Sequence, residues 1–168
     1  MPLLKNDPAF LKESKLIPVQ EYPALNNPNM SKSKANKIID TLMEKDYFSQ
    51  WLGVERIDEG EGFCRLKMTV RPEMCNGFSI AHGGISFSFA DSALAFASNS
   101  QGKHAVSIET SISHIKPILA GDVLLAIASE KSRSNRIGIY EVRIEKETGE
   151  LVALFKGTVF IKESPWKV

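Results

Sequence analysis

The feature that most restricts the fold is a long apolar segment, residues 84–99, whose hydrophobic side chains surround the helix axis. Between residues 85 and 97 only serines and Asp91 interrupt it. A helix that is apolar on nearly all sides is buried on nearly all sides. The sequence therefore predicts a central helix around which the other elements are wrapped.

Strand patterns surround this helix. Before it, residues 64–70 alternate apolar and polar side chains, which is typical of a half-buried strand. After it come four strand-like runs, separated by turn signals at Pro117/Gly121-Asp122, Ser132–Asn135 and Thr148-Gly149: Val106–Ile115, Val123–Glu130, Ile137–Glu145 and Leu151–Ile161. Short links favour an antiparallel meander after the helix. The expected class is α+β, with one helix and a curved antiparallel sheet.

The chain is expected to form one domain, residues 35–168, after an irregular leader. Residues 1–34 contain five prolines and no sustained periodicity, and Met30 is an alternative start. From Ala35, apolar residues recur on one face of a short helix that is expected to end near residues 51–53.

Charge and cysteine content exclude several classes of partner. The 168 residues include 21 basic and 20 acidic side chains, a net charge of +1, which predicts neither nucleic acid nor a membrane surface as partner. Cys64 and Cys75 have no nearby histidine at metal-ligand spacing, so no metal is expected. They look like reduced thiols, and the opening MPLLKNDPAF lacks the apolar core of a signal peptide. A cytoplasmic protein is expected.

The candidate chemistry lies in the segment Asn76–Gly84 and the helix that follows it. Asp91 is isolated among apolar and small residues, which is unfavourable unless it is hydrogen-bonded or its pKa rises. One interpretation is a general base or nucleophile in a dry pocket; the other is an ion pair with Lys116 or Arg136. Gly83 and Gly84 could form only a tight turn, but N–H groups at a helix N-terminus can also hold an oxyanion.

Spacing connects these two features. Asp91 lies eight residues after Gly83, which is roughly 12 Å along a helix. Groups that act on one carbonyl must lie within about 3 Å of the substrate atoms they contact. One chain therefore cannot supply both, whereas two antiparallel copies of the helix could. The spacing indicates a two-fold dimer with composite sites.

The segment MTVRPEMCNGFSIAHGGISFSFADSALAFASNSQG, followed by VALFKGTVF, resembles the PaaI-like (phenylacetic acid degradation) branch of the hotdog thioesterases. The resemblance extends from near Ala35 to Ile161. It implies the hotdog fold, a homotetramer of two dimers, and hydrolysis of acyl-CoA to free acid and coenzyme A without a cofactor. An aryl- or hydroxyphenylacetyl-CoA is one candidate substrate; a medium aliphatic acyl group is another, because the loop Phe78-Ser79-Ile80 varies among relatives.

The resemblance also implies roles for individual residues. Asp91 would activate water or attack the thioester carbonyl, and the N–H of Gly83 would bind the oxyanion. Asn76 would orient water or thioester from the opposite protomer, with His82 beside the thioester as a hydrogen-bond partner. The residues expected to bind substrate are Ser107 and Gly84 near the thioester, and Lys116, Arg133 and Arg136 at the CoA phosphates. Ordinary surface charge is an equal explanation for the last three.

Two other functions fit the same pattern. A hotdog hydratase or dehydratase would need a histidine near its carboxylate, and His82 is the only one close to Asp91 in sequence. A non-catalytic acyl-CoA-binding module would have little use for a buried carboxylate. Release of free thiol from acyl-CoA separates the three.

Overall fold

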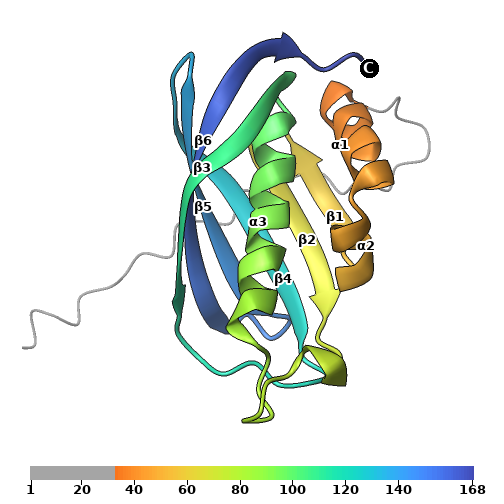
Figure 1. Cartoon of the computed structure of the whole chain (residues 1–168), viewed down its shortest axis with the longest axis vertical. Coiled ribbons are helices and arrows are strands. Elements are labelled where there is room, and N and C mark those ends of the chain that lie inside the picture. The colour runs from red at the N-terminus through yellow and green to blue at the C-terminus, as the bar shows by residue number, and fades with distance from the viewer. Residues whose placement is uncertain (1–32) are drawn as a thin grey trace, which may run out of the picture.

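The structure, a computed structural model that describes residues 33–168, has one long helix lying against a curled six-stranded antiparallel sheet (Figure 1). The elements in chain order are α1 (Lys34–Lys45), α2 (Tyr47–Leu52), β1 (Glu55–Gly60), β2 (Phe63–Thr69), a 3₁₀ turn (Pro72–Met74), α3 (Gly83–Asn99), β3 (Lys103–His114), β4 (Val123–Arg133), β5 (Ile137–Lys146) and β6 (Leu151–Pro165). The expected α+β arrangement is confirmed. The predicted leader, residues 1–34, lies outside the described residues except for Ser33 and Lys34, which are the N-cap and first residue of α1.

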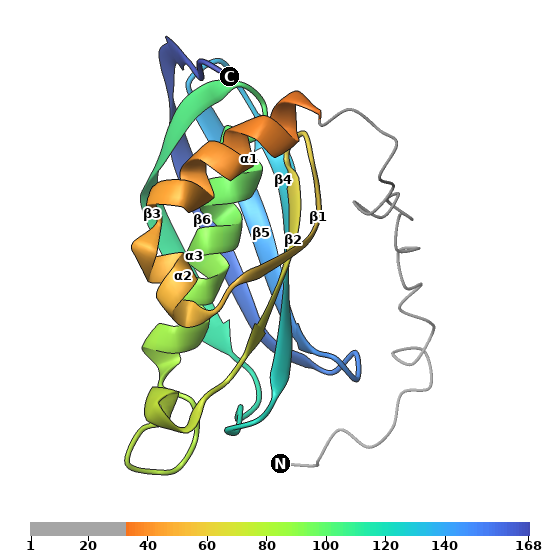
Figure 2. The same cartoon turned by 90° about the vertical axis from the view of Figure 1, so that its right-hand side faces the viewer.

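The first helical segment is two helices rather than the single helix expected from residue 35. Asp46 ends α1 and caps α2, where its Oδ1 accepts a hydrogen bond from the N–H of Ser49 at 2.9 Å. Gly53 then ends α2 in the left-handed conformation, with φ of 77°. The expected buried face of α1 is confirmed, since Ala35, Ile38 and Ile39 are buried. Figures 1 and 2 show α1 and α2 along one flank of α3, on the side of β1 and β2.

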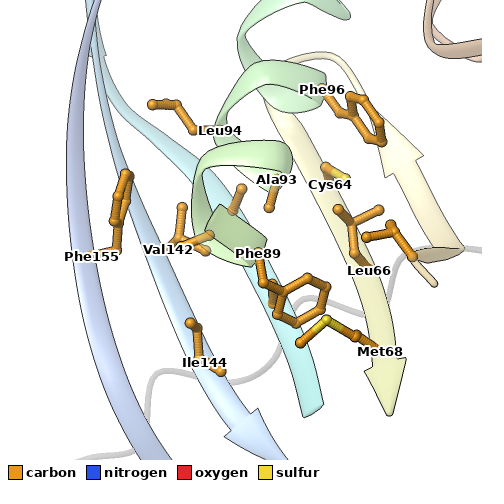
Figure 3. Packing of buried hydrophobic residues seen from close by; sticks show 14 of the residues in the cluster. Cys64, Leu66, Met68, Phe89, Ala93, Leu94, Phe96, Val142, Ile144 and Phe155 are labelled. Atoms are coloured by element: carbon orange, nitrogen blue, oxygen red, sulfur yellow. The ribbon is translucent and has the colours of Figure 1, made fainter. Parts of the chain in front are cut away.

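The core forms between α3 and the concave face of the sheet (Figure 3). Alternate residues of β2 point inward, as the pattern predicted, and meet apolar residues of α3 and the central strands. Fully buried members of this cluster include Cys64, Leu66, Met68, Phe89, Ala93, Val142 and Ile144. Strand β6 approaches α3 closely at Gly157, where an added Cβ would overlap the side chain of Leu94.

The sheet order β1-β2-β4-β5-β6-β3 corrects the predicted meander in one respect. Strands β4, β5 and β6 do form a meander, but β3 pairs with β6 at the far edge instead of with β4. The short link after β3 misled the prediction, because residues 115–122 pass below α3 in the view of Figure 1 and end in a turn at Leu119–Asp122. In that path the backbone of Ile118 accepts a hydrogen bond from Ala81 at 2.7 Å, which ties the crossing to the start of α3.

Strand β1 was not predicted at all. Its sequence, ERIDEG, carries four charged side chains, and it lies at the edge of the sheet beside β2. Among residues 33–168 no helix is long and apolar enough to cross a membrane.

Candidate active site

The turn before α3 presents one free N–H group. His82 is the N-cap of α3, and its Nδ1 accepts a hydrogen bond from the N–H of Gly84 at 3.0 Å. No described residue accepts a hydrogen bond from the N–H of Gly83. Because the N–H of Gly84 is already bonded to His82, only Gly83 of the predicted glycine pair offers a free N–H donor at the positive end of the helix dipole.

This N–H opens into a pocket of about 400 Å³, here called the Gly83 pocket. Its lining comes from the loop before α3 and from the crossing after β3: Asn76, Ile80, Ala81, Gly83, His114, Ile115, Lys116, Pro117 and Ile118. Asn76 turns its own loop, because its Oδ1 accepts from the N–H of Phe78 at 2.8 Å. Its Nδ2 has no acceptor among the described residues, so Asn76 and Gly83 both offer donors to one cavity.

The pocket also contains a residue that the sequence did not single out. His114, the last residue of β3, is exposed and lies next to Gly83. In sequence it is 23 residues from Asp91, and only the crossing of β3 to the edge of the sheet brings it to the start of α3. Proximity in sequence pointed to His82 alone, and the fold adds His114 at Gly83.

Asp91 lies in a second pocket, the Asp91 pocket, of about 240 Å³ between α3 and β3. Its lining consists of Asp91, Leu94, Ala95, Ser98, Ala105, Val106, Ser107 and Val159. Ser107 lines the same pocket as Asp91. The two pockets share no residue, and Gly83 and Asp91 remain roughly 12 Å apart along α3.

The carboxylate of Asp91 makes no hydrogen bond or ion pair with any described residue. Lys116 pairs with Glu150 at 2.5 Å instead, and Arg136 pairs with Glu163. The alternative explanation of Asp91, an ion pair with Lys116 or Arg136, is therefore wrong. Burial raises the pKa of Asp91 above its ordinary value, and the charge of Asp46 raises it further.

Asp46 is a second acidic residue that the sequence did not connect to the site. It lies at the break between α1 and α2, where its Oδ2 accepts from the hydroxyl of Ser49 at 2.6 Å. The same Ser49 oxygen lies 2.8 Å from the oxygen of Ser92, the neighbour of Asp91 on α3. These hydrogen bonds fix the α1–α2 break against the helix that carries Asp91.

The remaining predicted contacts are spread over the molecule. Lys116 lines the Gly83 pocket, within reach of a ligand there. Arg133 bonds to Glu130 and Tyr140, and Glu130 also accepts from Gln101, just beyond the C-terminus of α3. Arg136 directly precedes β5, near the same C-terminal end of α3. One protomer therefore does not bring these two arginines to Gly83. Among residues 33–168 no group of three or more His, Cys, Asp or Glu could hold a metal ion.

The open face of α3 carries these groups. Gly84 is exposed, and Phe87, Ser88, Asp91 and Ala95 are only partly buried, so these residues form a half-open stripe at helical spacing. The neighbouring strand β3 is unpaired on its outer side, with Val106 and Ile108 exposed at 44% and 58%. Strand β3 runs beside α3 (Figure 1), and Asp91 and Ala95 of the stripe line one pocket with Val106 of β3.

Comparison with known proteins gives a consistent result. Residues 78–153 match the model of the thioesterase superfamily. The acyl-coenzyme A thioesterase PaaI of Escherichia coli is 39% identical over 124 residues, which cover 74% of this chain and 89% of PaaI. A putative esterase of Archaeoglobus fulgidus is 36% identical over 74% of this chain and 80% of its own.

Solved structures agree. The structure of E. coli PaaI superimposes with a TM-score of 0.77 at 36% identity, covering 79% of this chain and 96% of PaaI. The TT0310 protein of Thermus thermophilus superimposes with a TM-score of 0.66 at 38% identity, covering 69% of this chain and 97% of its own.

Proposed function

The chain belongs to the PaaI-like branch of the hotdog thioesterases and is a thioester hydrolase, and from this premise we propose that it hydrolyses acyl-CoA to a free acid and coenzyme A. The observation that carries the proposal is the carboxylate of Asp91, half-buried and without a partner among the described residues. A packing residue would be paired, whereas a general base needs a free oxygen and a pKa closer to the working pH.

We propose that the working unit is a dimer in which Gly83 of one protomer faces Asp91 of the partner subunit. The separation of the two pockets within one chain supports this arrangement. So do the small residues of the α3 stripe, which allow a second helix to come close, and the open edge of β3, which can pair with a second copy. An antiparallel pair of α3 helices would bring the Gly83 pocket of one chain to the Asp91 pocket of the other.

In the proposed reaction the thioester carbonyl oxygen binds the N–H of Gly83, with Asn76 Nδ2 as a second donor from the same pocket. Asp91 of the partner subunit removes a proton from water, which attacks the carbonyl carbon; Ser107 would position that water. Negative charge develops on the carbonyl oxygen, where the two donors stabilise it. Collapse of this intermediate breaks the C–S bond, and the proton held by Asp91 restores the thiol of coenzyme A. Direct attack by Asp91, followed by hydrolysis of the anhydride, uses the same groups.

The nucleotide of coenzyme A extends from the Gly83 pocket toward solvent. Lys116 is the most suitable of the predicted cations to meet a phosphate, because it lines that pocket. Arg133 and Arg136 could contribute only from another subunit. No metal or organic cofactor is part of this mechanism.

The acyl group would lie along the stripe of α3, where Phe87 packs edge-on against Phe155 with ring centroids 5.4 Å apart. This surface suits an aryl- or hydroxyphenylacetyl group as well as a medium aliphatic chain. Phe78, 85% exposed in the loop beside Asn76, is available to cover it. A homotetramer of two dimers completes the proposed assembly, and the exposed aromatic residues of α2, Tyr47, Phe48 and Trp51, offer a surface for the dimer–dimer contact.

The test is release of free thiol from a panel of acetyl-, hexanoyl-, benzoyl-, phenylacetyl- and hydroxyphenylacetyl-CoA, with Asp91→Asn as the matched control. We expect at least one substrate to release thiol and the variant to lose most of that rate. Binding of acyl-CoA without thiol release would support the ligand-binding module instead. Conversion of an enoyl-CoA without thiol release would support the hydratase.

A further inference from the structure

The position of His114 gives it a direct part in the Gly83 pocket. An added Cβ on Gly83 would lie 3.1 Å from Nε2 of His114. Covalent geometry then places Nε2 within about 5.6 Å of the Gly83 nitrogen. A ligand can therefore reach both residues at once, with one atom bound to the N–H of Gly83 and a second atom, four or five bonds away, bound to His114.

The hydrogen bonds behind His114 assign its tautomer. The hydroxyl of Ser86 donates to the carbonyl oxygen of Gly83 at 3.1 Å, and its oxygen lies 3.3 Å from Nδ1 of His114. A hydroxyl has one proton, and here it goes to Gly83. We therefore assign the proton between Nδ1 and Ser86 to Nδ1, and in this tautomer Nε2 is an acceptor; the assignment follows from the network.

The acceptor lies among groups of another kind. Gly83 and Asn76 offer donors, Lys116 is a cation, and the other side chains that line this pocket are apolar. Within the part of the chain that the structure describes, Nε2 of His114 is thus the one side-chain acceptor of the Gly83 pocket that has no donor of its own. A ligand that fills the pocket should bring an N–H group to this nitrogen.

We propose that His114 binds the pantetheine arm of the substrate by accepting a hydrogen bond, at Nε2, from the amide N–H nearest the thioester sulfur. The inference rests on the proposed function. With the thioester oxygen on the Gly83 N–H, that amide nitrogen follows the sulfur after two methylene groups. A chain of this length spans roughly the distance between Gly83 and His114. His114 thereby selects thioesters of pantetheine-bearing carriers over simple thioesters.

The test compares two ligands and two variants at about pH 8, where imidazole groups are neutral. The ligands are coenzyme A and an analogue in which an ester oxygen replaces that amide nitrogen. His114→Phe keeps a flat ring but removes the acceptor, and His114→Gln restores an acceptor at similar reach. Because His114 is exposed at the end of an edge strand, both variants should fold.

We expect His114→Phe to weaken coenzyme A binding about 3- to 10-fold, the size of one neutral hydrogen bond. His114→Gln should bind within about 2-fold of the wild type, and the ester analogue should bind the wild type and His114→Phe equally. In thiol release from benzoyl-CoA or hexanoyl-CoA, the loss should appear in KM and leave kcat nearly unchanged.

Three results would overturn the inference. Unchanged coenzyme A affinity in His114→Phe would remove the contact, and an equal loss for both ligands would mean that the amide is not what His114 binds. A fall of kcat in both variants would make His114 a proton donor to the leaving sulfur instead. Each of these leaves thiol release by the wild type intact; absence of that release would refute the proposed function itself.

Discussion

The composite site can be tested by mixing two inactive variants. Asp91→Asn removes the base while keeping its shape, and Gly83→Pro removes the N–H donor. Proline is tolerated at the first residue of a helix, and the atom its Cβ would meet, Nε2 of His114, belongs to an exposed side chain. Each variant should fold and dimerise, and each should retain about 1% of the wild-type kcat or less.

The expected recovery follows from two-fold symmetry. Random association of equal amounts makes about half of the dimers mixed. In a mixed dimer one site combines both lesions and the other combines the intact Gly83 with the intact Asp91. About a quarter of all sites, and so about a quarter of the wild-type rate, should return. Pairing of these dimers into tetramers would not change that fraction.

The measurement is thiol release after the two variants are unfolded and refolded together. Two different affinity tags, applied in sequence, isolate the mixed dimers and should raise recovery to about half of the wild-type rate. If Gly83 and Asp91 of the same chain acted together, every site would carry a lesion. Purified mixed dimers as inactive as their parents would refute the geometry.

Three single substitutions, each studied alone, test the site and the core. Asp91→Asn alone should lower kcat about 100-fold or more in the thiol-release assay, yet raise the midpoint of thermal unfolding at neutral pH. The reason is that the pKa of Asp91 is raised by folding, so its charged form destabilises the folded state above that pKa, and the penalty disappears as pH falls through it; an unchanged or lower midpoint would contradict this. Asp46→Asn should lower the pKa of Asp91 and move the acid limb of the pH–rate profile to lower pH, because it removes a nearby negative charge; an unmoved limb would mean that Asp46 does not act on Asp91. Gly157→Ala should lower the free energy of unfolding in denaturant by about 1–3 kcal/mol, because its Cβ overlaps Leu94, and a neutral result would mean that α3 can shift away from β6.

The sequence predicted the elements that have a strong local pattern. The apolar segment gave α3 with its start at Gly83, one residue before the predicted segment, and the alternation of residues 64–70 gave β2. Asp91 was identified because it is the one charged residue in that apolar segment. In each case the side chains that carry the signal are adjacent along the chain, so periodicity was enough.

What the sequence did not predict depends on contacts between distant segments. The pairing of β3 with β6 is set by how the sheet curls around α3, which no local pattern encodes. His114 reaches Gly83 only through that pairing. Asp46 was hidden for a different reason: it interrupts an apolar pattern that continues past it, so one helix was expected where two occur.

The isolation of Asp91 becomes intelligible when the open stripe of α3 is considered. A cation in the same chain would lower the pKa of the carboxyl and occupy the oxygen that must accept a proton from water. Burial within the monomer would require such a partner, since an unpaired buried carboxylate is strongly unfavourable. The fold provides neither a cation nor full burial, because it leaves Asp91 half-buried on a surface of mostly small residues. A second copy docked on that surface would exclude water from Asp91, which raises the pKa of the carboxyl, and would bring the N–H of its own Gly83 to the thioester on which Asp91 acts. On this argument the carboxylate of Asp91 becomes a base of the required strength only in the assembled dimer. In the single chain it is less buried, and its pKa is raised less.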